Sequence, residues 1–192
     1  FYEKTVYSLL KKTIGIENGN FFPTAGAAVP DEICEFVHSV GINMLVGYGL
    51  TESTATVSCF QNSGYEIGSV GTVMPDVEVK IGENNEILLR GKTITKGYYK
   101  KAEATAEAID KEGWFHTGDA GYLNGNCLYL TERIKDLFKT SNGKYISPQA
   151  LETKLAIDRY IDQIAIIADQ RKFVSALIVP MYGFVKDYAK EK

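Results

Sequence analysis

The stretch that decides the fold is Val46-Gly47-Tyr48-Gly49-Leu50-Thr51-Glu52-Ser53-Thr54. The apolar run 42–46 leads into it and predicts a short buried strand that ends at the two glycines. Glycine permits a sharp turn or a close approach of the backbone to a ligand. The turn then offers an aromatic ring at Tyr48, a hydroxyl at Thr51 and a carboxylate at Glu52. These groups suit a nucleotide base, a phosphate and Mg²⁺. Taken alone, the turn fits a purely structural role equally well.

A strand and a helix precede this turn. Residues 21–30 predict a short strand that runs into the small residues Gly26-Ala27-Ala28. A helix should begin after Pro30 and end at Gly41. One face of this helix is expected to pack in the core through Ile33, Phe36, Val37 and Val40. A strand–helix–strand order is typical of an open α/β layer, which binds ligands at the carboxyl ends of its strands. We therefore expect the Gly26 and Tyr48 loops to lie at one edge.

The middle of the chain has the alternation of β-structure. Residues 77–81 and 87–89 predict a hairpin, and Asn124-Gly125 lies at the centre of a second one. A short alanine-rich helix is expected over 101–109, followed by the glycine-punctuated stretch 113–121.

A smaller α/β module is expected to follow. Ser147-Pro148 predicts a helix start, and the apolar runs 164–168 and 173–179 predict two strands. A last helix should begin after Pro180. We therefore predict a mixed α/β chain with two domains, 1–134 and 135–192. The first combines the end of an open α/β layer with a β-rich subdomain, and the second is a small, truncated α/β module.

The composition excludes several classes of protein. The 192 residues are 45% hydrophobic and carry a net charge of −3, which leaves no basic surface for nucleic acid. No apolar run is long enough to span a membrane, and the first residues lack the pattern of a signal peptide. The cysteines, Cys34, Cys59 and Cys127, lack metal-ligand spacing, which favours a reducing, cytoplasmic setting.

Three motifs occur in order along the chain: Tyr48-Gly49-Leu50-Thr51-Glu52, Gly113-Trp114-Phe115-His116-Thr117-Gly118-Asp119 and Arg133-Ile134-Lys135-Asp136. Together they resemble the adenylate-forming superfamily of acyl-CoA synthetases, peptide-synthetase adenylation domains and beetle luciferases. The stretches 133–139, 142–148 and 176–180 look most like its long-chain fatty acyl-CoA synthetase branch. The resemblance runs from about Phe21 to about Pro180.

The resemblance implies a site for ATP or AMP. Gly26, Ala27 and Ala28 would line the adenine through their backbone, and Tyr48-Gly49 would place an aromatic ring against it. Asp119 would accept hydrogen bonds from the ribose hydroxyls, with Arg133 reaching the same sugar. Each residue also has an ordinary structural explanation, such as a core tyrosine or a turn-capping aspartate. Gly97-Tyr98-Tyr99 fits the family pattern too, but a role in maintaining the fold is expected there, as it is for His116.

The resemblance also implies catalytic roles for Thr51, Glu52 and Lys139. Thr51 would contact the α-phosphate and Glu52 would hold Mg²⁺. Lys135 would be the hinge between two arrangements of the domains. Lys139, with Gly143 and Lys144, would face coenzyme A in the second arrangement. A solvated basic turn is the alternative for these last residues.

The implied activity is that of an acid–thiol ligase, which converts a long-chain fatty acid to an acyl-adenylate and then to a coenzyme A thioester. ATP or AMP, Mg²⁺, coenzyme A and the acid would be the only ligands expected of this stretch. A peripheral membrane contact of the full-length enzyme stays open. Another carboxylic acid, or a carrier protein as acceptor, is the alternative. A non-catalytic binding module that uses its tyrosines as a contact surface is the alternative from a different class.

The family's phosphate-binding loop and its late catalytic lysine have no counterpart in the sequence. We therefore expect a carboxyl-side fragment that does not turn over alone.

Overall fold

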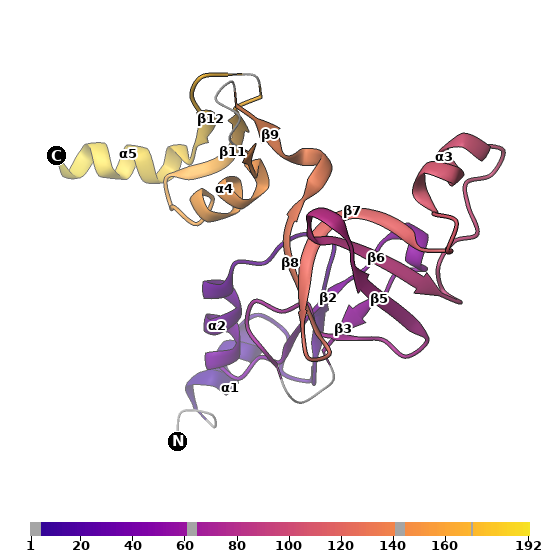
Figure 1. The fold of residues 1–192 in the computed structure, drawn as a ribbon. Coiled ribbons are helices and arrows are strands. Elements are labelled where there is room, and N and C mark those ends of the chain that lie inside the picture. Colours follow the sequence, from indigo (N-terminus) through magenta and orange to yellow (C-terminus); the bar gives the residue numbers. More distant parts are fainter. Residues whose placement is uncertain (1–4, 61–64, 141–144, 170) are drawn as a thin grey trace. The chain divides into compact units, whose positions relative to one another are not determined.

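The computed structural model describes residues 5–60, 65–140, 145–169 and 171–192. It divides the chain into two compact units, Phe1–Thr131 and Glu132–Lys192 (Figure 1). The boundary predicted from the sequence lay after Ile134.

The first unit is built on one eight-stranded sheet of order β1-β2-β3-β4-β8-β7-β6-β5. Its strands are β1 Phe22–Thr24, β2 Met44–Tyr48, β3 Ser58–Cys59, β4 Thr72–Val73, β5 Val77–Ile81, β6 Glu86–Gly91, β7 Phe115–Asn124 and β8 Cys127–Arg133. β1 and β2 are parallel, whereas β3 pairs antiparallel with β2. The sheet is therefore mixed. The open layer and the β-rich subdomain, predicted as separate parts, are joined because β2 pairs with both.

The helices of this unit are α1 Val6–Thr13, α2 Asp31–Ser39 and α3 Ala102–Ala108. α2 and α3 lie where the sequence predicted helices, but the core-facing side of α2 was predicted wrongly. Ile33 and Phe36 are 43% and 61% exposed, and Cys34 is the buried residue of the helix. The i, i+3, i+4 spacing correctly identifies an apolar stripe on α2, but the residue that the helix buries in the unit is Cys34.

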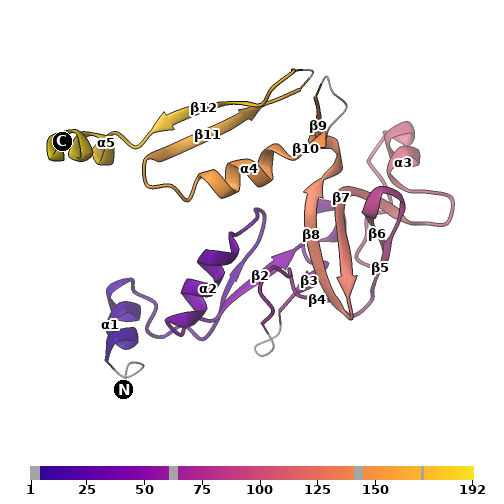
Figure 2. The same cartoon turned by 60° about the vertical axis from the view of Figure 1, so that its left-hand side comes forward.

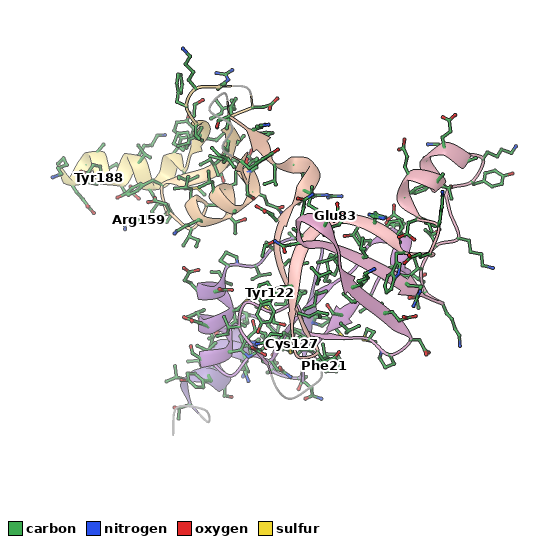
Figure 3. The ribbon with its side chains drawn as sticks, viewed as in Figure 1. Phe21, Glu83, Tyr122, Cys127, Arg159 and Tyr188 are labelled. Atoms are coloured by element: carbon green, nitrogen blue, oxygen red, sulfur yellow. The ribbon has the colours of Figure 1, made fainter. Side chains whose placement is uncertain are left out.

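The predicted β7–β8 hairpin is confirmed, with its turn at Gly125 and Asn126, and Figure 2 shows its strands running in opposite directions. Gly125 has the left-handed φ of +59° that such turns require. Tyr122, labelled with Cys127 in Figure 3, stacks on Tyr129 with 4.7 Å between ring centroids.

The core of the first unit is the cluster Tyr48, Val57, Val77, Ile87, Leu89, Phe115 and Leu128. Trp114 is also buried, at 8% exposure, and the guanidinium carbon of Arg90 lies 4.4 Å from its ring centroid. The same arginine forms a double hydrogen bond with Glu78, which raises the pKa of Arg90 and lowers the pKa of Glu78.

In its described residues, 132–140, 145–169 and 171–192, the second unit contains two antiparallel strand pairs and two α-helices, together with the short 3₁₀ helix η4. Its elements are η4 Ile134–Asp136, β9 Phe138–Lys139, β10 Tyr145–Ile146, α4 Pro148–Leu155, β11 Ile161–Ile167, β12 Ser175–Pro180 and α5 Tyr182–Glu191. Ser147 caps α4 as predicted, because its hydroxyl accepts the Ala150 N–H at 3.4 Å. Glu152 fastens α4 to β11, since its Oε1 accepts the Ile166 N–H at 2.8 Å.

Arg159 and Tyr188, labelled in Figure 3, belong to a group of ring contacts between the residues just before β11 and helix α5. The Arg159 guanidinium lies over the Tyr160 ring at 4.8 Å, and that ring meets Tyr188 edge-on. Within the described ranges, no helix is long and apolar enough to cross a membrane.

Candidate functional site

The parallel pairing of β1 and β2 sets the edge on which the site is built. Phe22 pairs with Met44 and Thr24 pairs with Val46, so both strands run toward the same edge. The turn at Gly26 and the turn at Gly49 therefore leave the sheet at that edge, which confirms the expectation from the sequence. β2 begins and ends two residues later than the predicted strand 42–46, because Gly47 and Tyr48 stay in the strand and pair with Cys59 and Ser58.

Tyr48 and Asp119 are joined directly, although 71 residues separate them. The Tyr48 hydroxyl donates a hydrogen bond to Asp119 Oδ2 at 2.7 Å. The Tyr48 ring is only 8% exposed and belongs to the core cluster. β2 and β7 are four steps apart in the sheet order, which would separate them by about 19 Å in a flat sheet. The sheet must therefore curl over its core to bring the two side chains into contact.

Backbone contacts fix Asp119 from the other side. Its N–H donates to Thr117 Oγ1 at 3.1 Å, and that hydroxyl donates to the Ile87 carbonyl at 2.7 Å. Thr117 is buried, so its side chain has little freedom to move. Asp119 is itself half-buried. Its carboxylate is thus held at a defined position, which is what recognition of two vicinal hydroxyls requires.

Glu86, at the start of β6, clamps the strand just before Asp119. One carboxylate oxygen accepts the Gly118 N–H at 2.9 Å, and the other lies 2.8 Å from His116 Nδ1. The β6–β7 register shifts between Glu86 and Leu88, which is the position that this side chain spans. His116 Nε2 lies 3.9 Å from Asp110 Oδ2, so the histidine stands between two carboxylates. Sequence reasoning did not identify Glu86, because no local pattern marks a residue 33 positions before Asp119.

Asp110 closes the turn that leads into β7. Its Oδ1 accepts the N–H groups of both Glu112 and Trp114 at 2.9 Å. Foremost through the Trp114 N–H, these bonds hold the pKa of the Asp110 carboxyl below its usual range. The start of β7 is therefore fixed before the chain reaches Asp119.

The turn after β2 is tight and strained. A Cβ at Gly49 would lie 1.3 Å from the Ala55 carbonyl oxygen, so only glycine fits there. Thr54 and Ala55 both have left-handed φ angles, +55° and +81°, which non-glycine residues adopt at a cost. Ser53 is fully buried, and its Oγ accepts the Leu50 N–H at 2.9 Å. Backbone strain that the surrounding structure holds in place is common at ligand-binding sites.

The turn presents Thr51 and Glu52 in the 3₁₀ helix Thr51–Ser53. Thr51 is exposed and Glu52 is half-buried. The Tyr98 hydroxyl donates to Glu52 Oε1 at 2.9 Å, and the Thr95 N–H donates to the Glu52 carbonyl at 2.7 Å. The hydrogen bond to Glu52, and then burial, raise the pKa of Tyr98 above its usual range. Tyr98 was expected to serve the fold, and its contact with Glu52 was missed.

Glu52 fits a magnesium ion that is shared with phosphates. Mg²⁺ in proteins commonly takes one or two carboxylates together with substrate phosphates, rather than a complete cage of side chains. In the part of the chain that the structure describes, no group of three or more His, Cys, Asp or Glu residues could hold a metal. Glu52 is a half-buried carboxylate in the 3₁₀ turn after β2, which matches an ion held by one side chain and the substrate phosphates.

Gly26, Ala27 and Ala28 form an exposed turn after β1. Gly26 has a φ of +91°, and a Cβ there would meet nothing within 4 Å. The glycine is thus required by backbone conformation and not by crowding. The open space around it is compatible with a flat ligand.

The remaining predicted residues lie in or next to the second unit. Arg133 is half-exposed, with its Nε 4.0 Å from Asp136 Oδ2. Lys135 belongs to η4, and its side chain lies outside what the structure describes. Lys139 on β9 is exposed, and its ammonium group lies 5.6 Å from the Tyr145 ring centroid. Gly143 and Lys144 lie outside the described residues.

The first unit is thus a mixed α/β fold that presents a threonine and a carboxylate on the turn after β2 and holds an aspartate at a fixed position on β7. Residues 3–99, just over half of the chain, match the family described as AMP-binding enzyme. The chain therefore belongs to this adenylate-forming family.

The chain is similar in sequence to curated relatives with two different acceptors. The chain is 34% identical over 179 residues to long-chain-fatty-acid–CoA ligase 1 of Saccharomyces cerevisiae, covering 86% of this chain and 26% of the relative. It is 30% identical over 200 residues to the chloroplastic long-chain-fatty-acid–[acyl-carrier-protein] ligase AEE15 of Arabidopsis thaliana, covering 93% of this chain and 27% of the relative. The chain thus spans less than a third of the length of these relatives.

A solved structure shows the same fold. O-succinylbenzoate coenzyme A synthetase from Bacillus subtilis, in complex with ATP and magnesium ion, superposes with a TM-score of 0.73 at 26% identity. The match covers 89% of this chain and 39% of the synthetase. The eight-stranded mixed sheet therefore corresponds to part of an adenylation domain.

Proposed function

We propose that this chain forms the nucleotide-binding part of an acyl-activating ligase that converts a long-chain fatty acid to its acyl-adenylate and then to its coenzyme A thioester. The observation that carries the proposal is the bond from Tyr48 to Asp119, in the same unit as the Thr51–Glu52 turn. Similarity to the yeast CoA ligase supports the fatty acid as substrate. Because the chain spans about a quarter of that relative, the activity of the whole protein is part of the proposal.

In the first step, a carboxylate oxygen of the acid attacks the α-phosphorus of ATP. A new P–O bond forms, and the bond to pyrophosphate breaks with both electrons leaving on the pyrophosphate oxygen. Both reactants are anions, so catalysis rests on positioning and on compensating charge. Asp119 would accept the ribose hydroxyls, Tyr48 would lie at the adenine, and Gly26, Ala27 and Ala28 would line it. The Thr51 hydroxyl would donate a hydrogen bond to the α-phosphate.

Glu52 would hold Mg²⁺ at the phosphates. The ion, when bound, supplies positive charge that offsets the charge of the phosphate oxygens. What the chain itself contributes is a carboxylate whose side chain is fixed by Tyr98.

In the second step, the thiol of coenzyme A attacks the acyl carbon, a C–S bond forms, and AMP leaves with the electrons of the C–O bond. Lys139 would meet coenzyme A, together with Gly143 and Lys144. Lys135 would be the hinge that changes which residues face the acyl-adenylate. The exposure of Lys139 suits contact with a large polar cosubstrate.

A carrier protein is the alternative acceptor, because a relative of similar identity is an acyl-carrier-protein ligase. Another carboxylic acid is the alternative substrate, since the synthetase of similar fold is described for O-succinylbenzoate. Pyrophosphate exchange by the full-length enzyme with fatty acids of graded length and one aromatic acid separates the substrates. Product formation with coenzyme A or with a carrier protein separates the acceptors.

The nucleotide site is tested by calorimetric titration with AMP. We expect AMP to bind the full-length enzyme, and Asp119→Asn to weaken binding about tenfold or more, because an amide replaces one of the charged acceptors. Glu78→Gln is the matched control, since Glu78 is an exposed carboxylate of the same sheet. A full-length enzyme that does not bind AMP, or an Asp119→Asn variant that binds it normally, would overturn the proposal.

A further inference from the structure

The segment 93–98 is attached to the Glu52 turn at three points. The Thr95 N–H donates to the Glu52 carbonyl at 2.7 Å, and the Thr54 hydroxyl donates to the Thr93 carbonyl at 2.7 Å. The third contact is the bond from the Tyr98 hydroxyl to Glu52 Oε1 at 2.9 Å. The first two contacts locate the backbone of the turn. Only the third acts on the carboxylate itself.

Tyr98 is held in place from behind by α3. Its N–H donates to Thr105 Oγ1 at 2.9 Å, and the same hydroxyl donates to the Lys101 carbonyl at 2.8 Å. Gly97 lies against this helix so closely that a Cβ there would come within 2.5 Å of Thr105 Cγ2. The backbone position of Tyr98 is therefore set by α3 and not by Glu52 alone.

A phenol suits a carboxylate that must also attract a cation. A lysine or arginine would fix Glu52 equally well but would neutralise its charge and repel a second cation. A neutral hydroxyl orients one oxygen and leaves the negative charge in place.

From this geometry we propose that Tyr98 is a positioning residue, which orients Glu52 for a divalent cation bound together with the nucleotide phosphates. The inference rests on the proposed function, in which Glu52 holds that cation. The inference goes beyond the proposed function because it assigns a role in the site to Tyr98, 46 positions from Glu52 in the sequence. The other contacts of its segment with the turn hold only the backbone.

The test measures ATP binding to the full-length enzyme by calorimetry at a series of Mg²⁺ concentrations. Tyr98→Phe keeps the ring and removes only the hydroxyl. We expect the Mg²⁺ concentration for half-maximal ATP binding to rise on the order of tenfold, because a hydrogen bond to a charged group is lost. AMP binding without Mg²⁺ should be unchanged. Tyr99→Phe is the matched control, since the adjacent ring is 87% exposed, and it should change neither quantity.

A double-mutant cycle keeps the result specific. In a Glu52→Gln background the charge is already absent, so adding Tyr98→Phe should leave the Mg²⁺ dependence where Glu52→Gln puts it. If Tyr98→Phe kept the original Mg²⁺ dependence of ATP binding, the positioning role would be refuted and the proposed function would stand. The same would follow if AMP binding without Mg²⁺ weakened as much as Mg²⁺-dependent ATP binding, because that result indicates a structural role. An unaltered enzyme that binds no nucleotide would refute the proposed function and this inference with it.

Discussion

The two candidate carboxylates, Asp119 and Glu52, are fixed in different ways. Asp119 belongs to a ten-residue strand, has buried neighbours on both sides and is bonded to a core tyrosine. Glu52 belongs to a three-residue 3₁₀ turn and depends on a segment, 93–98, that reaches it from elsewhere in the chain. A sheet fixes a side chain through its own ladder and core, whereas a turn needs outside support. We therefore expect substitutions near Asp119 to act through the core, and substitutions near Glu52 to act through the backbone of the turn and the segment that supports it.

The largest effect is expected from Gly49→Ala, which tests whether the turn is as tight as its geometry implies. The added Cβ would collide with the Ala55 carbonyl oxygen, so the turn must open. We expect a loss of about 3 kcal/mol or more in the free energy of unfolding, measured by urea titration. Gly125→Ala is the control, because a Cβ there meets nothing within 4 Å and only the left-handed backbone opposes it. Its expected loss is about 1–2 kcal/mol. Equal losses for the two variants would contradict the crowded turn.

Tyr48→Phe probes the sheet side of the comparison. It removes the hydroxyl that donates to Asp119 while keeping the ring in the core. We expect the free energy of unfolding to fall by about 1–2 kcal/mol and AMP binding to weaken with it. Tyr122→Phe is the matched control, since that ring is half-exposed on the same sheet, and it should change stability by less than about 0.5 kcal/mol. If Tyr48→Phe bound AMP normally, the hydroxyl would have no part in positioning Asp119.

Glu86→Gln tests the clamp that Glu86 makes on β7. A glutamine can still accept the Gly118 N–H, but a neutral amide is a weaker acceptor than a carboxylate. Gly118 directly precedes Asp119, so we expect AMP affinity to fall several-fold, measured by calorimetric titration. Glu78→Gln is the matched control, since Glu78 is an exposed carboxylate of the same sheet. An unchanged AMP affinity would show that the clamp has no part in positioning Asp119.

The smallest effect is expected from Ala55→Gly, on the turn side. Glycine adopts the observed φ of +81° without strain but adds freedom to the unfolded chain, so the two terms partly cancel. We expect a gain of about 0.5 kcal/mol in the free energy of unfolding. Ala108→Gly, at the end of α3, is the control and should lose about 0.5–1 kcal/mol. A loss at Ala55 would mean that the backbone there is not strained.

Local features of the fold could be predicted from the sequence because they depend on neighbouring residues. The hairpin at Asn124-Gly125 and the Ser147-Pro148 helix start are set by a few adjacent side chains, and both are confirmed. The exposure of Ile33 and Phe36 could not be predicted, because periodicity finds an apolar stripe but does not show what covers it.

The same distinction applies to the site. The motif residues Tyr48, Glu52 and Asp119 were selected by type and order, but their contacts were not predictable. The bond between Tyr48 and Asp119 depends on the curl of a sheet whose order no local pattern encodes. The bond from Tyr98 to Glu52 depends on a segment that returns from 46 residues away. Roles that rest on Arg133, Lys135 and Lys139 stay predictions.

Trp114 is the one tryptophan among the 192 residues, and it lies in the first unit. Its shielded indole therefore provides a natural optical reporter, whose emission should shift to the red when this unit alone melts. The second unit, without an indole, is silent at that wavelength. A denaturation curve followed by fluorescence and by circular dichroism would thus show, without any label, whether the two units unfold together.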